Sequence, residues 1–235
     1  MNNLKPYEIN QNNVIPTWLN INSNSIASFN SIVTFDINQV GKINELYLLF
    51  NMSSITGVTA NAVLSQPAPI SAFKWFTNVT YSYQGSVVDT VTNDQNFIHQ
   101  QISFDDQDRV YLNTASGNYQ SQAQRYLLGQ NSNIYQVPLR SFINQIQPEI
   151  LNSSAHSIRL AVTLDSLVNI LDVGALVGAA SMTINSVSLL VKMQKMDIPT
   201  INYKMNQLLR LGKYQDIFVV ICNNNLQFYQ VLQQQ

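Results

Sequence analysis

The sequence predicts an antiparallel all-β domain, either a sandwich or a barrel. In the stretch "ELYLLFNMSS", Leu46, Leu48 and Phe50 share one parity. Glu45 and Asn51 lie on the other, together with further apolar residues. Successive side chains of a strand point to opposite faces, so this alternation predicts a sheet with one apolar face and one mixed face. Similar stretches follow one another without regular strand–helix alternation, which argues against a parallel sheet.

The first strands are expected over residues 31–37 and 43–53, separated by a turn at Gly41. The stretch "NAVLSQPAPIS" contains two prolines and is expected to be a loop. The segments "FTNVTYSY" and "VVDTVT" flank the short turn "QGS", a spacing that is typical of a β-hairpin.

A short helix is expected after the hairpin, with Asn93 or Asp94 as its cap. Phe97 and Ile98 place apolar side chains near one face of that helix. Residues 105–133 are polar and lack a sustained period, so they are predicted to form a long irregular loop with a functional or interface role.

The remaining elements are expected to be mainly strands. "IYQVPL" is predicted to be a short strand that Pro138 ends, and "RSFINQIQPEIL" shows helix-like spacing. "SIRLAVTL" alternates and is predicted to continue through "SLVNIL". "MTINSVSLLVKM" is predicted to be a long strand with a slip in its alternation near Asn185.

Three regions are expected along the 235 residues. Residues 1–30 are rich in Asn and Ser and are predicted to be an extended N-terminal arm, anchored near Trp18. Residues 31–195 form the all-β domain. Residues 196–235 combine a helix-like stretch with strand-like runs, and they are predicted to be a linker or extension, or the start of a second barrel.

The composition is unusual in its charge. Charged residues make up 11% of the chain, against about a quarter in ordinary proteins, and the formal net charge is −1. Asn, Gln, Ser and Thr carry the polarity instead, which suits a surface covered by copies of the same protein; an AT-rich genome would also raise the Asn content. No basic stripe is present, which argues against dedicated nucleic-acid binding. The uncharged stretch 173–191 is interrupted by Ser, Thr and Asn, so a loop followed by a strand is expected there and not a membrane span.

The sequence shows no pattern of an active site, and an enzyme is not expected. The two histidines, His99 and His156, lack the spacing of metal ligands, and the single Cys222 lies in an apolar run. No catalytic or cofactor-binding residue is assigned, and no cofactor is expected.

One acidic cluster remains as a candidate cation site. Asp105, Asp106 and Asp108 could supply oxygen ligands to calcium, but the glycine and distal glutamate of the helix–loop–helix calcium motif are missing. A solvated loop, or a helix cap with an ion pair to Arg109, is the preferred interpretation.

Several segments, taken in order, resemble the double jelly-roll major capsid proteins of viruses. "FDINQVGKINELYLLFNMS" resembles the opening strands of that family, and "PISAFKWFTNVTYSYQGSVVDTVTNDQNFIHQ" resembles its central hairpin and short helix. "VPLRSFINQIQPEILNSSAHSIRLAVTL" and "MTINSVSLLVKMQKMD" resemble later strands of the first barrel, and "INYKMNQLLRLGKYQ" resembles the linker to the second. The resemblance covers residues 30–215 and is one of pattern and order.

The resemblance implies an antiparallel jelly-roll sandwich with short helical insertions and extended terminal segments. It implies a structural capsid protein that self-assembles into trimeric or pseudo-hexameric capsomers of an icosahedral shell, located in the virion and assembled inside the host cell. The implied partners are copies of the chain and other capsid or minor virion proteins, with contact to an inner membrane layer left open. The chain has room for about one barrel, so a fragment of a two-barrel protein and a single-barrel capsid protein, major or minor, both remain open.

In such a jelly roll, the inward-facing set would include Leu46, Leu48, Phe50, Val79, Tyr81, Leu160 and Val162. The outward face would contact neighbouring barrels. The alternative function is a carbohydrate- or receptor-binding β-sandwich, which would need exposed aromatic side chains along a groove, with Trp75 and Tyr119 as the candidates.

Overall fold

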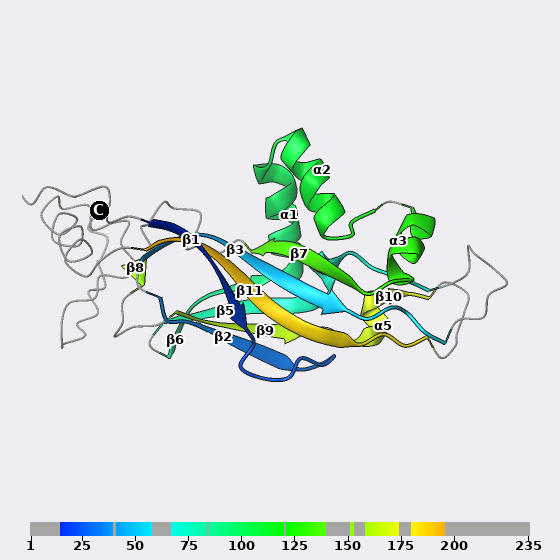
Figure 1. Ribbon diagram of the computed structural model, residues 1–235, viewed down its shortest axis with the longest axis horizontal. Coiled ribbons are helices and arrows are strands. Elements are labelled where there is room, and N and C mark those ends of the chain that lie inside the picture. The colour runs from blue at the N-terminus through cyan, green and yellow to red at the C-terminus, as the bar shows by residue number, and fades with distance from the viewer. Residues whose placement is uncertain are drawn as a thin grey trace, which may run out of the picture.

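The computed structural model describes residues 15–39, 41–57, 67–83, 85–119, 121–139, 151–152, 158–173 and 180–195. Two antiparallel sheets face each other across a shared core, and the helices of residues 93–129 stand on one side of them (Figure 1). The strands of sheet 1, in spatial order, are β1 (Ile15–Asn22), β11 (Ile184–Lys195), β3 (Gly41–Met52) and β7 (Asn133–Leu139), with β8 (Leu151–Asn152) also paired to β3. The strands of sheet 2 are β2 (Ile32–Ile37), β9 (Ile158–Leu164), β5 (Phe76–Tyr83) and β6 (Ser86–Thr92).

The chain moves from one sheet to the other at almost every connection between these strands. β1, β3, β7 and β11 belong to sheet 1, whereas β2, β5, β6 and β9 belong to sheet 2. The first and last of the described strands, β1 and β11, are neighbours, and the β5–β6 hairpin stays within sheet 2. This wrapping is the jelly-roll topology of two-sheet viral capsid and lectin domains, and it confirms the predicted fold class.

Apolar side chains from both inner faces fill the space between the sheets. The inward-facing set that the resemblance implied is buried without exception: Leu46, Leu48, Phe50, Val79, Tyr81, Leu160 and Val162. Aromatic rings dominate the centre, where Phe50 meets Trp75 edge-to-face at 5.5 Å between ring centroids and stacks on Phe76 at 6.4 Å. Strands with apolar residues at every second position therefore form the sandwich because each sheet buries one face against the other.

Of two sequence predictions for the paired strands β3 and β11, one is confirmed and one is wrong. The predicted slip near Asn185 is confirmed, because the pairing of β11 with β3 shifts register between Ile184 and Ser186. Gly41, predicted to be a turn residue, is instead the first residue of β3 and pairs with Lys195. Its φ of 153° and a carbonyl oxygen 2.2 Å from the position of a β-carbon explain why glycine stands there.

The end of β7 also differs from the expectation. Pro138 lies inside this strand and does not end it. Strand β7 is at the edge of sheet 1, where a residue without a backbone N–H is tolerated. The carbonyl oxygen of Pro138 accepts hydrogen bonds from Asn96 (3.0 Å) and Gln100 (3.2 Å), so this edge is where the first helix is attached to the sheet.

The helix predicted after the hairpin is α1 (Asn93–Ser103), but its cap is Thr92. The Thr92 hydroxyl accepts from the backbone N–H of Gln95, and the Gln95 side chain accepts from the backbone N–H of Thr92. This reciprocal capping box satisfies two otherwise unpaired backbone donors.

The prediction of an irregular loop over residues 105–133 is wrong. The region contains α2 (Asp106–Ala115) and α3 (Gln122–Gly129). Helix α2 buries only Leu112, and α3 buries only Gly129, so neither sequence shows an apolar stripe. Helix α5 (Leu167–Ile170) likewise replaces the predicted continuation of β9, since Ser166 accepts a hydrogen bond from the backbone N–H of Asn169 and starts a helical turn.

The terminal regions are described in part. Ile15–Asn22, within the predicted arm, is strand β1 and pairs with β11 along its whole length, so this stretch is part of the sheet and not an arm. The helix-like spacing over residues 140–150 and the linker over 196–235 lie outside the described residues. In the described part of the chain, no helix is long and apolar enough to cross a membrane.

Candidate assembly surface

The outer face of sheet 2 is neutral and rich in hydroxyl groups. Thr34, Ala161, Thr80 and Thr90 form one row across its strands, as the strand registers show. The Thr90 hydroxyl donates to Thr80 Oγ1 at 3.5 Å, so parts of this row are already hydrogen-bonded within the sheet. Such a face can remain in contact with water, and its large exposed apolar side chains, Ile32 and Val87, stand apart on the opposite edge strands β2 and β6.

The one ion pair described on that face joins Asp36 and Arg159. Arg159 Nε lies 2.7 Å from Asp36 Oδ1, and Asn24 Nδ2 donates to Asp36 Oδ2 at 2.8 Å. The hydrogen bond from Arg159 is the main reason why the pKa of Asp36 is below its ordinary value. The same pairing raises the pKa of Arg159. The contact crosses from β2 to β9 and therefore supports the register of sheet 2.

The outer face of sheet 1 is different, because aromatic and aliphatic groups stand among its polar residues. Trp18 on β1 is 52% exposed, and its ring lies 6.0 Å from that of Tyr47 on β3. The Nζ atom of Lys192, on the strand between them, lies 5.5 Å from the centre of the Trp18 ring. It also lies 2.6 Å from Glu45 Oε1, while the Tyr47 hydroxyl donates to Glu45 Oε2 at 2.5 Å. The mixed face of "ELYLLFNMSS" thus carries a connected network of rings and charges.

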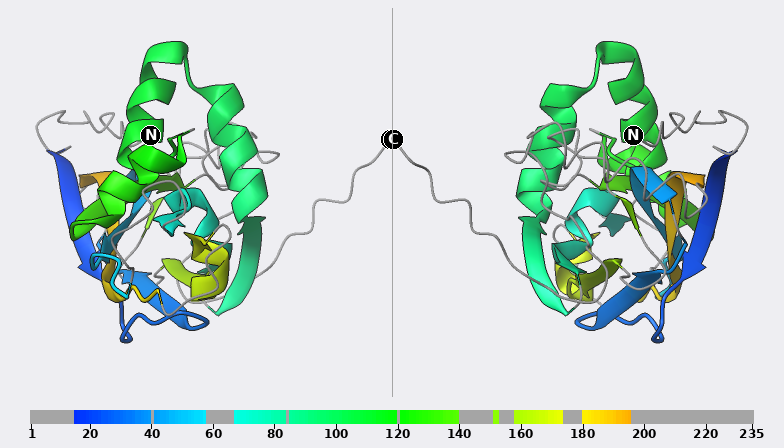
Figure 2. Two further views of the ribbon diagram at one scale, coloured as in Figure 1. Left: turned by 90° about the vertical axis from the view of Figure 1, so that its right-hand side faces the viewer. Right: turned by 90° about the vertical axis from the view of Figure 1, so that its left-hand side faces the viewer.

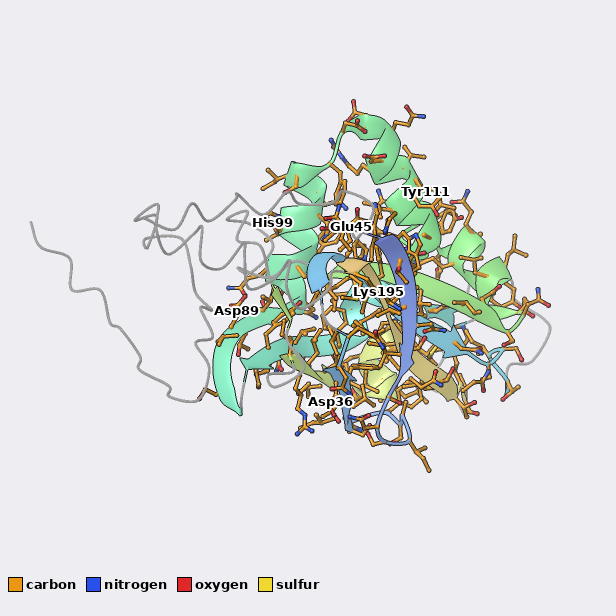
Figure 3. The ribbon with its side chains drawn as sticks, turned by 60° about the vertical axis from the view of Figure 1, so that its left-hand side comes forward. Asp36, Glu45, Asp89, His99, Tyr111 and Lys195 are labelled. Carbon is orange, nitrogen blue, oxygen red and sulfur yellow. The ribbon has the colours of Figure 1, made fainter. Side chains whose placement is uncertain are left out.

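A helical hairpin, made of α1 and α2, rises beside this face (Figure 2). Gln101 Nε2 donates to Asn113 Oδ1 at 3.2 Å and joins the two helices. The hairpin and the outer face of sheet 1 enclose a groove of about 540 Å³, whose aromatic lining residues are Trp18, Tyr47, Phe104 and Tyr111. Figure 3 shows Glu45 below the hairpin that bears Tyr111, and Asp36 at the opposite end of the molecule.

The hairpin exposes large apolar side chains to solvent. Tyr111 is 65% exposed, and Ile98, Ile102 and Val110 are each more than half exposed. Exposed apolar side chains of this size on two neighbouring helices make the hairpin a candidate interaction site. We define the assembly surface as the outer face of sheet 1 together with this hairpin.

The acidic cluster lies at the start of α2. Asp105 caps the helix, accepting from the backbone N–H of Asp108 at 2.9 Å, and Asp106 Oδ1 lies 2.9 Å from Arg109 Nη2. The predicted cap and ion pair are therefore confirmed. Among the described residues, no group of three or more His, Cys, Asp or Glu side chains is arranged to hold a metal ion.

The aromatic residues proposed for a sugar-binding platform occupy other places. Trp75 is 1% exposed and packs edge-to-face on Tyr135 at 4.7 Å, so it belongs to the core. Tyr119 is partly buried, and its carbonyl oxygen accepts from Arg125 Nη1 at 2.6 Å. Among the described aromatic residues, Trp18 and Tyr111 are the ones with large exposed rings, and the sequence alone did not place these two on one surface. They come from strands and helices far apart in the chain, so no local pattern could have joined them.

Comparisons with known proteins identify the fold. No family model and no curated protein matches the chain. A chain of the PBCV-1 virus capsid is similar in structure, with a TM-score of 0.57 and 20% identity, over 82% of this chain and 44% of that one. PBCV-1 VP54, whose crystal structure was fitted into a reconstruction of the virophage Sputnik, gives a TM-score of 0.58 at 20% identity, over 81% of this chain and 45% of that one.

A further similar structure, the mavirus major capsid protein, has a TM-score of 0.42 and 15% identity, over 78% of this chain and 48% of that one. This chain spans less than half the length of each of the three proteins. The resemblance to viral capsid proteins is thereby confirmed for the fold: the chain folds as a jelly roll like that found in the PBCV-1 capsid structures.

Proposed function

We propose that the chain is a structural protein of a viral capsid and that it assembles with copies of itself into capsomers. The observation that carries this proposal is the jelly-roll topology, which the PBCV-1 capsid structures share over about four fifths of the chain. A structural role also suits the chemistry of the described residues, whose charged groups mostly stand in ion pairs or at helix caps.

The proposed contact between copies is the assembly surface. It offers the large aromatic anchors that are common at the centres of interfaces, with Trp18 and Tyr111 as the most exposed. Around them stand amide and hydroxyl groups, including Asn20, Asn51 and Gln136, which can form hydrogen bonds without the desolvation cost of an unpaired charge. The mixed face of the opening strand would thus be covered by another protein.

This chain covers less than half of each similar PBCV-1 structure, so those proteins are long enough to contain a second unit of comparable size. We propose that residues 31–195 belong to one jelly roll, to which β1 adds a strand, and that 196–235 lead towards or begin a second. In the virion, other capsid or minor proteins would contact the remaining surfaces. The intact mass of the virion component would distinguish a two-barrel protein from a single barrel.

The test is the oligomeric state of the purified full chain. Light scattering and analytical ultracentrifugation should show trimers, rings or larger assemblies that dissociate on dilution. A well-behaved monomer at high concentration, together with absence of the chain from purified virions, would refute the proposal. A glycan array is the companion measurement, because specific sugar binding by a monomer would favour the alternative of a carbohydrate-binding module.

A further inference from the structure

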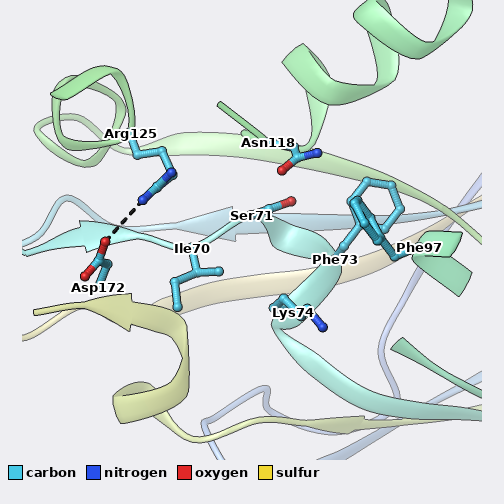
Figure 4. A pocket seen from close by; sticks show the side chains of 8 residues that line it. All are labelled: Ile70, Ser71, Phe73, Lys74, Phe97, Asn118, Arg125 and Asp172. Carbon is cyan, nitrogen blue, oxygen red and sulfur yellow. Dashed lines mark hydrogen bonds and ion pairs between the residues drawn. The ribbon is translucent and has the colours of Figure 1, made fainter. Parts of the chain in front are cut away.

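A cavity of about 310 Å³ lies where the short 3₁₀ helix η2 (Ala72–Lys74), α1, α3 and the two-residue strand β10 (Leu171–Asp172) come together (Figure 4). Its size is at the lower end of the range for sites that bind small molecules. It shares the helix α1 with the assembly surface, through Phe97, but it shares no lining residue with the groove beside sheet 1.

Ser71 presents an unused hydroxyl to this cavity. The residue is 8% exposed, and its Oγ atom has no hydrogen-bond partner within the described part of the chain. Ser71 is the cap residue of η2, where a serine side chain commonly accepts a backbone N–H, yet it makes no such bond. Figure 4 shows the hydroxyl turned into the space framed by Asn118, Arg125 and Phe73. A buried hydroxyl group without a hydrogen bond lowers the stability of the fold, unless another group supplies that bond.

The other residues that line the pocket are apolar or uncharged, or they are charged side chains whose charges are cancelled by an ion-pair partner. Phe73 and Phe97 meet edge-to-face at 5.3 Å between ring centroids and form one side, next to Ile70. Arg125 Nη2 lies 3.1 Å from Asp172 Oδ2 at another side. The remaining cation, Lys74, is paired with Asp94. A charged guest would find no uncompensated opposite charge here, so a neutral guest is favoured.

We propose that this cavity binds a small neutral molecule that has an apolar ring or short chain and a single hydroxyl or amide group. The polar group would bond to the Ser71 hydroxyl, and the apolar part would lie against Phe73 and Phe97. Because the walls come from separate elements, η2, α1, α3 and β10, a bound guest holds these elements together and stabilises the folded chain. The proposal concerns a pocket within one chain and does not depend on the proposed capsid role.

An ordered water molecule is the competing occupant. A buried water needs several polar partners. The polar side chains that line the pocket besides Ser71, namely Asn118, Arg125, Asp172 and Lys74, already bond to other residues, and the rest of the lining is two phenyl rings and an isoleucine side chain. A guest with one polar group and an apolar body matches this lining better than water does, and the experiment below separates the two.

The experiment compares phenol with toluene, which have nearly the same shape but differ in the hydroxyl group. Binding of each probe to the full chain is measured by titration calorimetry, and thermal unfolding shows that every variant is folded. Phenol should bind about 2- to 10-fold more tightly than toluene, the ratio expected for one net hydrogen bond. Ser71→Ala should remove this preference without weakening toluene binding, and Ser71→Leu should fill the space and weaken both.

Equal affinity of the native chain for the two probes, or a preference that survives Ser71→Ala, would overturn the proposal. So would a crystal structure grown with phenol in which only a water molecule contacts Ser71. The chain's oligomeric state is not a readout in this design, so failure here leaves the capsid proposal standing, and failure of assembly leaves this one standing.

Discussion

The substitution Trp18→Ala should weaken the association of the chain with its copies more than it weakens folding. The ring is half exposed in the isolated chain, and within that chain it contacts Tyr47 and Lys192. An aromatic pair and a cation–π contact of this kind are together worth about 1–2 kcal/mol, so the free energy of unfolding should fall by that amount. For a chain of this size the corresponding decrease in Tm is roughly 2–8 °C.

The effect on association should be larger. A tryptophan side chain buries about 150–250 Å² when fully covered, so roughly 100 Å² of Trp18 remains to be buried by a partner. At about 25 cal/mol per Å² this area is worth about 2.5 kcal/mol per contact, or close to a 70-fold change in the association constant.

Sedimentation velocity over a concentration series measures this change, and chemical denaturation measures stability in parallel. Ile26→Ala is the control, because Ile26 is 93% exposed in the connection between β1 and β2, outside the strands and helices that form the assembly surface. Association should be unchanged in this variant. If Trp18→Ala associates as well as the native chain, or if Ile26→Ala weakens association equally, the outer face of sheet 1 is not the contact between copies.

Substitutions at three further positions test the fold itself. Gly41→Ala should destabilise the chain by about 1–3 kcal/mol in chemical denaturation, because the new β-carbon would lie 2.2 Å from the carbonyl oxygen of Gln194; an unchanged midpoint would contradict the described strand start. Phe50→Ala should cost about 3–5 kcal/mol and Phe50→Leu clearly less, since Phe50 is fully buried between the sheets. Arg159 lowers the pKa of Asp36, so the stability that this carboxylate contributes is complete above the ordinary aspartate pKa of about 3.9 and is lost as the pH falls through the lowered value. Asp36→Asn should therefore flatten the pH dependence of the unfolding free energy in acid, and a slope equal to that of the native chain would refute the ion pair.

The local patterns of the sequence determined much of the strand content. Alternation at Leu46 and Leu48, and again at Leu160 and Val162, marks the residues that are buried between the sheets. The break in alternation near Asn185 corresponds to a real shift in register. These features are readable because the two faces of a strand meet different environments at every second residue.

The helices of the assembly surface were harder to predict from the sequence than the strands. Helix α2 buries a single side chain, Leu112, so its apolar residues do not form the stripe by which a helix is recognised. The cap at Asp105 was a usable signal, and it pointed to the helix start but not to the helix length. The expected cap of α1, Asn93 or Asp94, was wrong, although the spacing of Thr92 and Gln95 is that of a capping box.

By itself, the sequence determined that this is an antiparallel β protein with few charges, and its alternation indicated most of the side chains that are buried in the core. The tertiary structure decided which strands are neighbours, and only that arrangement brings Trp18, Tyr47 and Lys192 onto one face beside Tyr111. The reason is physical: alternation specifies which side of each strand is apolar, whereas the order of strands depends on long-range pairing and on how both sheets close over a common core. The contacts that make a surface therefore join residues that the linear pattern keeps apart.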